Sequence, residues 1–133
     1  MSMTMMKQAA FGLAALAALA AVAGSAAVAQ TAADLAPAFG NTILSTYPSG
    51  RQTHLWLERG GTFEGLRSRG QRMSGVWTVN GRGELCLRQR RPVPLPVNYC
   101  TPVVRGGVGT RWSAKAPTGE TIQVQLVAGQ ARR

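Results

Sequence analysis

The sequence contains few acidic residues, one histidine and two cysteines. Its 133 residues include five Asp and Glu against 15 Lys and Arg, so the formal net charge is +10. Five carboxylates cannot readily supply metal ligands, paired acid and base groups and a soluble surface together. We therefore predict no catalytic residues, no metal site and no cofactor. The length allows one small domain and leaves little room for a second.

An uncharged apolar run near the N-terminus predicts export. Met1–Lys7 carries one positive charge, and the stretch 11–28 is mostly Ala, Leu and Val. It ends on Ala27-Val28-Ala29, a small-x-small site of the kind that signal peptidase cuts, followed by Gln30. The alternative is an uncleaved membrane anchor, because about 18 to 20 apolar residues span a bilayer. The high Ala content and the cleavage site favour a signal helix over 1–29 that is removed.

The cleaved protein is predicted to be periplasmic or secreted, with no membrane contact. Cleavage leaves 104 residues, which we divide into an N-terminal arm over 30–40 and a single domain over 41–133. A chain of this size buries only a modest core, so a covalent link would stabilise it usefully.

The two cysteines supply a candidate link. Cys86 and Cys100 form an even pair in an exported chain, which indicates a disulfide. It would close a ring of 15 residues, for which the loop-entropy model gives about 3 kcal/mol. A redox pair normally has the spacing Cys-x-x-Cys, and a zinc site needs further ligands where only His54 remains.

Turn signals and alternating segments predict an all-β domain. Gly- and Pro-containing turns recur every eight to twelve residues, and the segments between them alternate apolar and polar side chains with period two. The stretch 90–97 contains three prolines and predicts an extended loop. We expect an antiparallel meander of about eight strands that closes into a small barrel and so removes its exposed edges. The expected strands are 42–47, 53–58, 62–66, 74–79, 84–89, 98–103, 110–115 and 121–127.

The arginines are the first candidate for binding. Two clusters are the densest, one beside the proline-rich loop and one in a single hairpin: Arg88, Arg90 and Arg91, and Arg67, Arg69 and Arg72. Guanidinium groups pair with phosphates, anionic polysaccharides and acidic protein surfaces. The alternative is that the arginines reflect a G+C-rich genome and keep an exported protein soluble. No nucleic acid is expected, because aromatic residues are not interleaved with these arginines.

The only histidine belongs to the second candidate. His54, Trp56 and Glu58 share one face of an expected strand and form a candidate pocket. A general base needs an oriented partner and a nearby nucleophile, and no local motif such as Gly-x-Ser-x-Gly provides them. A surface or cross-strand histidine is the alternative.

Several short motifs carry a family resemblance. They are Gly61-Thr62-Phe63-Glu64-Gly65, Ser74-Gly75-Val76-Trp77-Thr78-Val79, Leu85-Cys86-Leu87 and Tyr99-Cys100. In this order they resemble small exported proteins of Gram-negative bacteria that are built on lipocalin-like β-barrels, over residues 41 to 127. Exported barrels of similar size include inhibitors of secreted metalloproteases and of lysozyme. In the metalloprotease inhibitors an N-terminal arm enters the enzyme, and here 31–40 occupies the matching place without a distinctive residue.

These observations together predict a non-catalytic periplasmic or secreted binding module, expected as a monomer. Its partner would be an unidentified protein, as for the inhibitors, or an anionic polymer of the cell envelope. The alternative is a small hydrolase-like enzyme that uses His54 with a nearby carboxylate.

Overall fold

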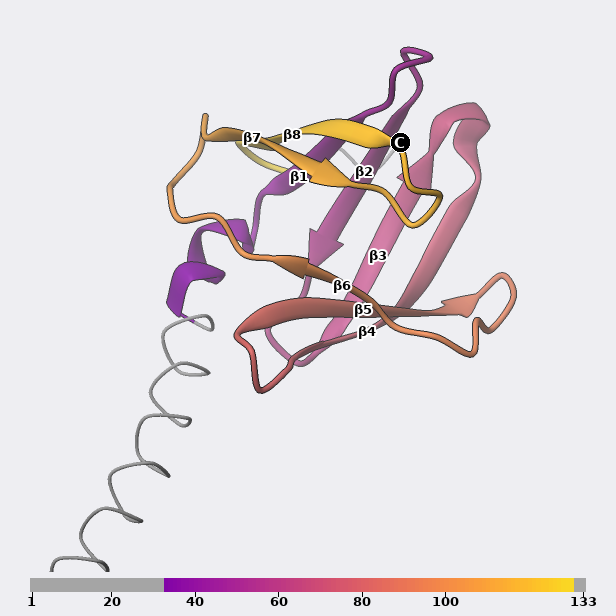
Figure 1. Cartoon of the computed structure of the whole chain (residues 1–133), viewed down its shortest axis with the longest axis horizontal. Coiled ribbons are helices and arrows are strands. Elements are labelled where there is room, and N and C mark those ends of the chain that lie inside the picture. The colour runs from indigo at the N-terminus through magenta and orange to yellow at the C-terminus, as the bar shows by residue number, and fades with distance from the viewer. Residues whose placement is uncertain (1–32, 131–133) are drawn as a thin grey trace, which may run out of the picture.

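The computed structural model describes residues 33–130, which form one sheet of eight antiparallel strands curled into a nearly closed barrel (Figure 1). The strands are β1 (Thr42–Thr46), β2 (Gln52–Leu57), β3 (Thr62–Arg67), β4 (Arg72–Val79), β5 (Glu84–Arg91), β6 (Tyr99–Pro102), β7 (Arg111–Lys115) and β8 (Thr121–Val127). Two 3-10 turns, η1 (Ala36–Ala38) and η2 (Ser68–Gly70), precede β1 and link β3 to β4. The predicted all-β barrel is confirmed, whereas the predicted signal helix lies outside the described residues.

Strands that follow one another in the sequence pair in the sheet, except β6 and β7, and β8 returns to pair with β1. The resulting order is β6-β5-β4-β3-β2-β1-β8-β7. Short turns produce this meander, because they reverse the chain within a few residues and leave consecutive strands side by side. In the first turn, for example, Gly50 has φ 85°, a conformation that glycine adopts without steric cost.

Side chains alternate between the interior of the barrel and its outer face, as the sequence pattern predicts. In β8, Ile122, Val124 and Leu126 are buried, whereas Thr121 and Gln123 are exposed. Along this strand the inner face is therefore apolar and the outer face is polar and exposed to solvent.

A register shift bends the sheet between β4 and β5. It occurs at Ser74 and Gly75. A Cβ atom added to Gly75 would lie 2.0 Å from the carbonyl oxygen of Arg88, so only glycine allows the two strands to approach this closely.

One end of the barrel is closed by the N-terminal segment. Leu35 and Ala38 are buried in a core cluster whose other members come from β2, β3, β5 and β8: Leu57, Phe63, Leu85 and Leu126. The ring of Phe39 lies 5.8 Å from that of Trp77, and the Trp77 indole donates a 2.7 Å hydrogen bond to the Glu58 carbonyl. We call this end, with the connections 58–61, 80–83 and 103–110, the plugged end. Part of the predicted N-terminal arm is thus packed into the core.

The opposite end carries the connections 47–51, 68–71, 92–98 and 116–120, which lie together on the right in Figure 1. We call it the arginine-rich end, because both predicted arginine clusters lie there. No such plug covers it among the described residues.

The barrel does not close completely, in contrast to the prediction that closure removes its edges. β6 and β7 are the two ends of the sheet order and do not pair as strands. β6 has four residues and ends at Pro102, which has no N–H group for a further ladder hydrogen bond. Across this seam the Tyr99 hydroxyl donates a hydrogen bond to the carbonyl of Lys115.

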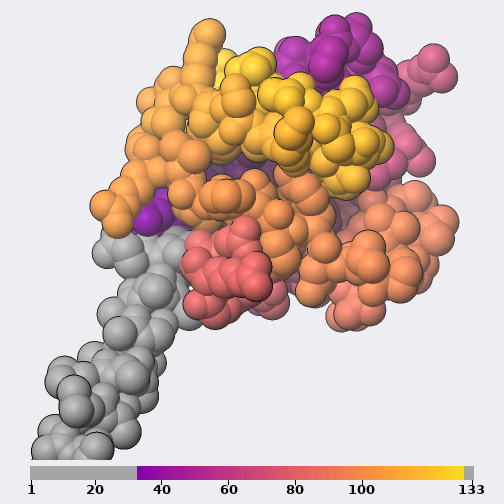
Figure 2. Space-filling model, in the orientation of Figure 1, coloured from indigo at the N-terminus to yellow at the C-terminus, as the bar shows by residue number. Residues whose placement is uncertain are grey.

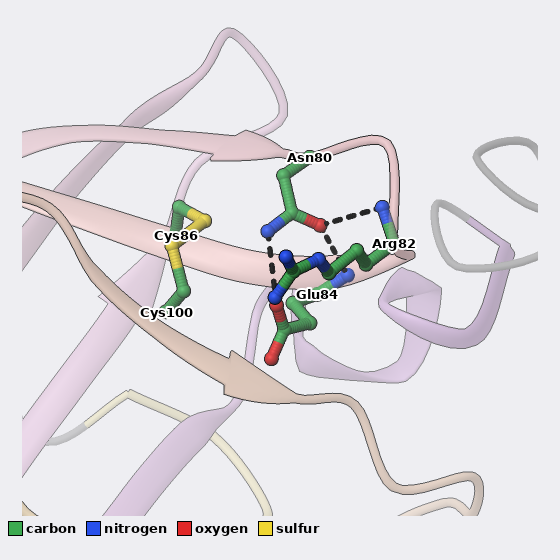
Figure 3. The surroundings of a disulfide bond; sticks show 5 residues. All are labelled: Asn80, Arg82, Glu84, Cys86 and Cys100. Atoms are coloured by element: carbon green, nitrogen blue, oxygen red, sulfur yellow. Dashed lines mark hydrogen bonds between the residues drawn. A yellow bond between two sulfur atoms is a disulfide. The ribbon is translucent and has the colours of Figure 1, made fainter.

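A disulfide holds the edge strand β6 against β5. Cys86 and Cys100 lie opposite each other in the register, with their Cα atoms 4.0 Å apart, and form the predicted bond (Figure 3). Beside it the Asn80 side chain organises the β4–β5 turn: its oxygen accepts 3.0 Å hydrogen bonds from the backbone N–H groups of Arg82 and Glu84. The covalent link therefore fixes the position of β6 along one side of the seam.

Candidate functional site

A cavity of about 300 Å³ lies inside the barrel and extends from the plugged end to the arginine-rich end. This volume is at the lower limit of the range of about 300 to 1,000 Å³ that is typical of small-ligand sites. Figure 2 shows the surface hollowed between β6 and the β7–β8 hairpin, where the sheet does not close.

The wall of the cavity is mostly apolar. Each of the eight strands contributes a side chain to it: Ile43, Leu55, Phe63, Met73, Leu87, Tyr99, Trp112 and Val124. Below them, the Leu35 and Ala38 side chains of the N-terminal segment form the floor. An apolar chamber of this kind favours an apolar guest, because burial removes the guest's surface from water.

Polar side chains gather where the cavity reaches the arginine-rich end. Ser45, Tyr47, Thr53, Arg67 and Gln89 line it there. Leu95, Val97 and Pro117 of the neighbouring loops also line this end, so the cavity has an apolar interior and a mouth of mixed polar and apolar side chains.

Two charged side chains line the cavity, and they lie at opposite ends. At the plugged end, Asp34 forms a 3.3 Å ion pair with Arg105. At the arginine-rich end, Arg67 donates a 3.0 Å hydrogen bond to the side-chain oxygen of Gln89. Within residues 33–130, no carboxylate lies within ion-pair distance of Arg67. Its positive charge is therefore not neutralised by the protein described.

The six arginines predicted to bind anions occupy one end of the molecule but different surfaces. Arg67 points inward from the end of β3, and Arg69 lies in η2. Arg72, Arg88 and Arg90 are exposed on β4 and β5, on strand positions that alternate with cavity-lining residues, and Arg91 ends β5. The fold thus brings the two arginine clusters to the same end of the barrel, with Arg67 lining the cavity and the others on the surface around it.

Charge is segregated along the barrel axis. The arginine-rich end has one carboxylate, Glu120, among many basic residues: Arg51, Arg67, Arg69, Arg72, Arg88, Arg90, Arg91 and Lys115. Three of the other described carboxylates, Asp34, Glu58 and Glu84, lie at the plugged end, and Glu64 lies midway along β3 in register with Ser74 and Arg91. The mouth of the cavity therefore lies in a strongly positive field.

The predicted pocket of His54, Trp56 and Glu58 is not part of this cavity, because β2 turns Thr53 and Leu55 inward instead. The imidazole of His54 stacks on the Trp56 indole with ring centroids 6.2 Å apart. Trp56 is fully buried although it lies on the outer face of β2. Its indole N–H donates a 2.8 Å hydrogen bond to the Thr42 hydroxyl, which in turn donates one of 2.7 Å to the Gly129 carbonyl.

The phenol of Tyr99 lies at the seam and lines the cavity. Partial burial raises the pKa of Tyr99, and the negative charge of an ionised Tyr47 would raise it further, whereas a hydrogen bond with the Thr101 side chain lowers it. The neutral phenol is therefore the favoured form in the folded protein well into the alkaline range.

Metal binding finds no support in the described part of the chain, where no three His, Cys, Asp or Glu side chains lie together as a metal site requires. Within the same residues no helix is long and apolar enough to span a bilayer. Comparison of the chain with protein-family models, curated proteins and solved structures found no match.

The cavity and the inward position of Arg67 were not predicted from the sequence. A signal for the latter was available, because Phe63, Gly65 and Arg67 alternate with Thr62, Glu64 and Leu66. Extending the strand by one residue beyond 66 would have placed Arg67 on the inner face. The cavity itself has no such signal, because it depends on how the strands close.

Proposed function

We propose that the protein is a non-catalytic binding module of the periplasm or the extracellular space that takes a small apolar molecule into its barrel. The observation that carries this proposal is the cavity of about 300 Å³ with its apolar wall and hollowed seam. Each methylene that such a guest buries contributes about 0.8 kcal/mol.

The position of the histidine supports binding over hydrolysis. His54 lies on the outer face of β2, stacked on Trp56, whereas the cavity is on the other side of the strand. A guest inside the barrel would therefore be separated by the sheet from the imidazole that a hydrolase mechanism would need.

A second binding surface is supported by the charge segregation. Arg72, Arg88 and Arg90 are exposed on the outer face of β4 and β5, and together they outnumber the one carboxylate in register with this region, Glu64, which lies opposite Ser74. This arrangement favours an anionic polymer of the cell envelope as a second partner, held by many weak contacts with guanidinium groups.

The apolar site is tested by titrating the purified protein with 1-octanol in a calorimeter. We expect saturable binding of one molecule per protein, with a heat capacity of binding below zero because apolar surface is buried. Trp112 lines the cavity, so its fluorescence should change with the same midpoint. Heats of titration that show no saturation, together with unchanged tryptophan fluorescence, would contradict the proposal.

A further inference from the structure

The cavity combines an apolar chamber with a single uncompensated charge at its mouth. Asp34, the other charged residue in the wall, is already paired with Arg105 at the plugged end. Arg67 has no carboxylate at ion-pair distance among residues 33–130. A guest with a negative group would complete this end of the site, because it would supply the anionic partner that Arg67 lacks and would accept charge-assisted hydrogen bonds from the guanidinium.

The Arg67 guanidinium is held in place by a relay of hydrogen bonds. Gln89 accepts a 3.0 Å hydrogen bond from Arg67 through its side-chain oxygen. The amide nitrogen of the same side chain donates a 3.1 Å hydrogen bond to the carbonyl of Val93 in the proline-rich loop. Since a guanidinium has five N–H donors, the one bond to Gln89 leaves donors in a planar fork that matches a carboxylate or phosphate.

The exposure of Arg67 suits a charged headgroup. Arg67 is exposed, whereas Phe63 and Leu85 deeper in the cavity are buried. A head placed at Arg67 would stay in contact with water and avoid the cost of burying an ion, while an attached chain would enter the apolar interior. Seven further basic residues around this end would attract the anion electrostatically: Arg51, Arg69, Arg72, Arg88, Arg90, Arg91 and Lys115.

We infer that the ligand is a single-chain amphiphile with an anionic head, whose chain fills the barrel and whose head binds the Arg67 guanidinium. This inference rests on the proposed function and adds the chemical class of the guest. Gln89 acts as a positioning residue, because it orients Arg67 without needing to touch the ligand.

The experiment compares octanoate with 1-octanol, which have chains of equal length and differ in the charge of the head. Octanoate is titrated below its critical micelle concentration and 1-octanol below its solubility limit, into the wild-type protein and into Arg67→Gln, Gln89→Glu and Arg72→Gln. Arg72 lies in the same hairpin as Arg67, is exposed and does not line the cavity, so Arg72→Gln is the matched control. Gln89→Glu keeps the shape of the side chain and places a carboxylate against Arg67.

We expect Arg67→Gln and Gln89→Glu each to weaken octanoate binding by about tenfold or more, the loss typical of a charged hydrogen bond. Octanol affinity should change by less than about threefold, and Arg72→Gln should affect neither ligand. In the wild-type protein, the affinity for linear carboxylates should rise about fourfold with each methylene added to the chain, from hexanoate to octanoate. Octanoate binding should also weaken as the salt concentration rises.

The two proposals fail in different ways. If octanol binds but octanoate affinity is the same in the wild type and Arg67→Gln, the anionic class is wrong and the apolar site stands. An equal loss of octanoate binding in Arg72→Gln would also overturn the inference, because a surface arginine would then contribute as much as Arg67. If neither ligand binds saturably, both proposals fall.

Discussion

Trp56 is buried although the strand pattern places it on the outer face of the barrel, and its side chain takes part in a relay of hydrogen bonds through Thr42 to Gly129. The alternation in β2 correctly predicts that Trp56 and His54 share one face of the strand, and the structure places this face on the outside of the barrel. The complete burial of Trp56 was not predictable, because it depends on contacts with residues distant in sequence. Its indole binds Thr42, which binds Gly129 in turn, across 87 residues of chain.

This relay makes Thr42 a sensitive position. Thr42→Val would leave the buried Trp56 N–H without its acceptor while keeping the shape of the side chain, and we expect a loss of about 1 to 3 kcal/mol in the free energy of unfolding. Denaturant titration followed by tryptophan fluorescence measures this loss. Thr46→Val on the same strand is the control, since Thr46 makes only a long, exposed contact with Gln52 at 3.4 Å. Equal effects of the two substitutions would contradict the role assigned to the relay.

Among the elements, strand positions were the most predictable feature. β8 has the predicted bounds, because its apolar and polar residues alternate without interruption. β5 runs two residues further than predicted, to Arg91, because exposed arginines extend a strand without an apolar signal. The missing β6–β7 pairing was not predicted, because the pattern shows where strands form and gives no measure of how closely the first and last edges approach.

The disulfide between β5 and β6 is the covalent part of this edge. Replacing both partners, as Cys86→Ala with Cys100→Ala, should lower the free energy of unfolding by about 3 kcal/mol, the chain-entropy value for a 15-residue ring. Chemical denaturation measures the change, and wild-type protein reduced with a thiol should show the same midpoint as the double variant. Free sulfhydryl groups in denatured, unreduced wild-type protein would contradict the link.

The seam between β6 and β7 should respond to alkaline pH through Tyr99. Burial raises the pKa of this phenol above its value in the unfolded chain, where it is near 10.0. The folded state therefore holds the proton more tightly, and its advantage is fully present below pH 10 and is lost as the pH rises through the raised pKa. We expect the stability of the wild type to fall more steeply above pH 10 than that of Tyr99→Phe. Parallel stability curves for the two proteins would exclude this contribution.

At the scale of the whole molecule, the sequence indicated the components of the site without their arrangement. The two arginine clusters were visible as runs, Arg67 to Arg72 and Arg88 to Arg91, but their meeting at one end depends on the meander. The cavity was not predictable, because it is the volume that the inward side chains leave unfilled after the barrel forms.

The outer arginines should bind anionic polymers if the charge segregation is functional. Changing Arg88, Arg90 and Arg91 to Ala should lower the salt concentration at which the protein elutes from heparin. The variant makes fewer contacts with the polymer, so fewer counterions are released when it binds. A triple variant of Arg59, Arg82 and Arg111 at the plugged end carries the same change in net charge and should elute later than the first. Identical elution of the two variants would show that only net charge matters.

If the interior of the barrel is the binding site, a larger side chain placed inside it should block the guest. Ala114 lines the cavity from β7, whereas its neighbour Ser113 is exposed on the outer face. Ala114→Phe and Ser113→Phe therefore add the same side chain to the two faces of one strand. We expect octanol binding to be lost or weakened by at least about tenfold in Ala114→Phe and to be unchanged in Ser113→Phe, with both variants folded as judged by circular dichroism. Equal octanol affinity in the two variants would contradict this prediction.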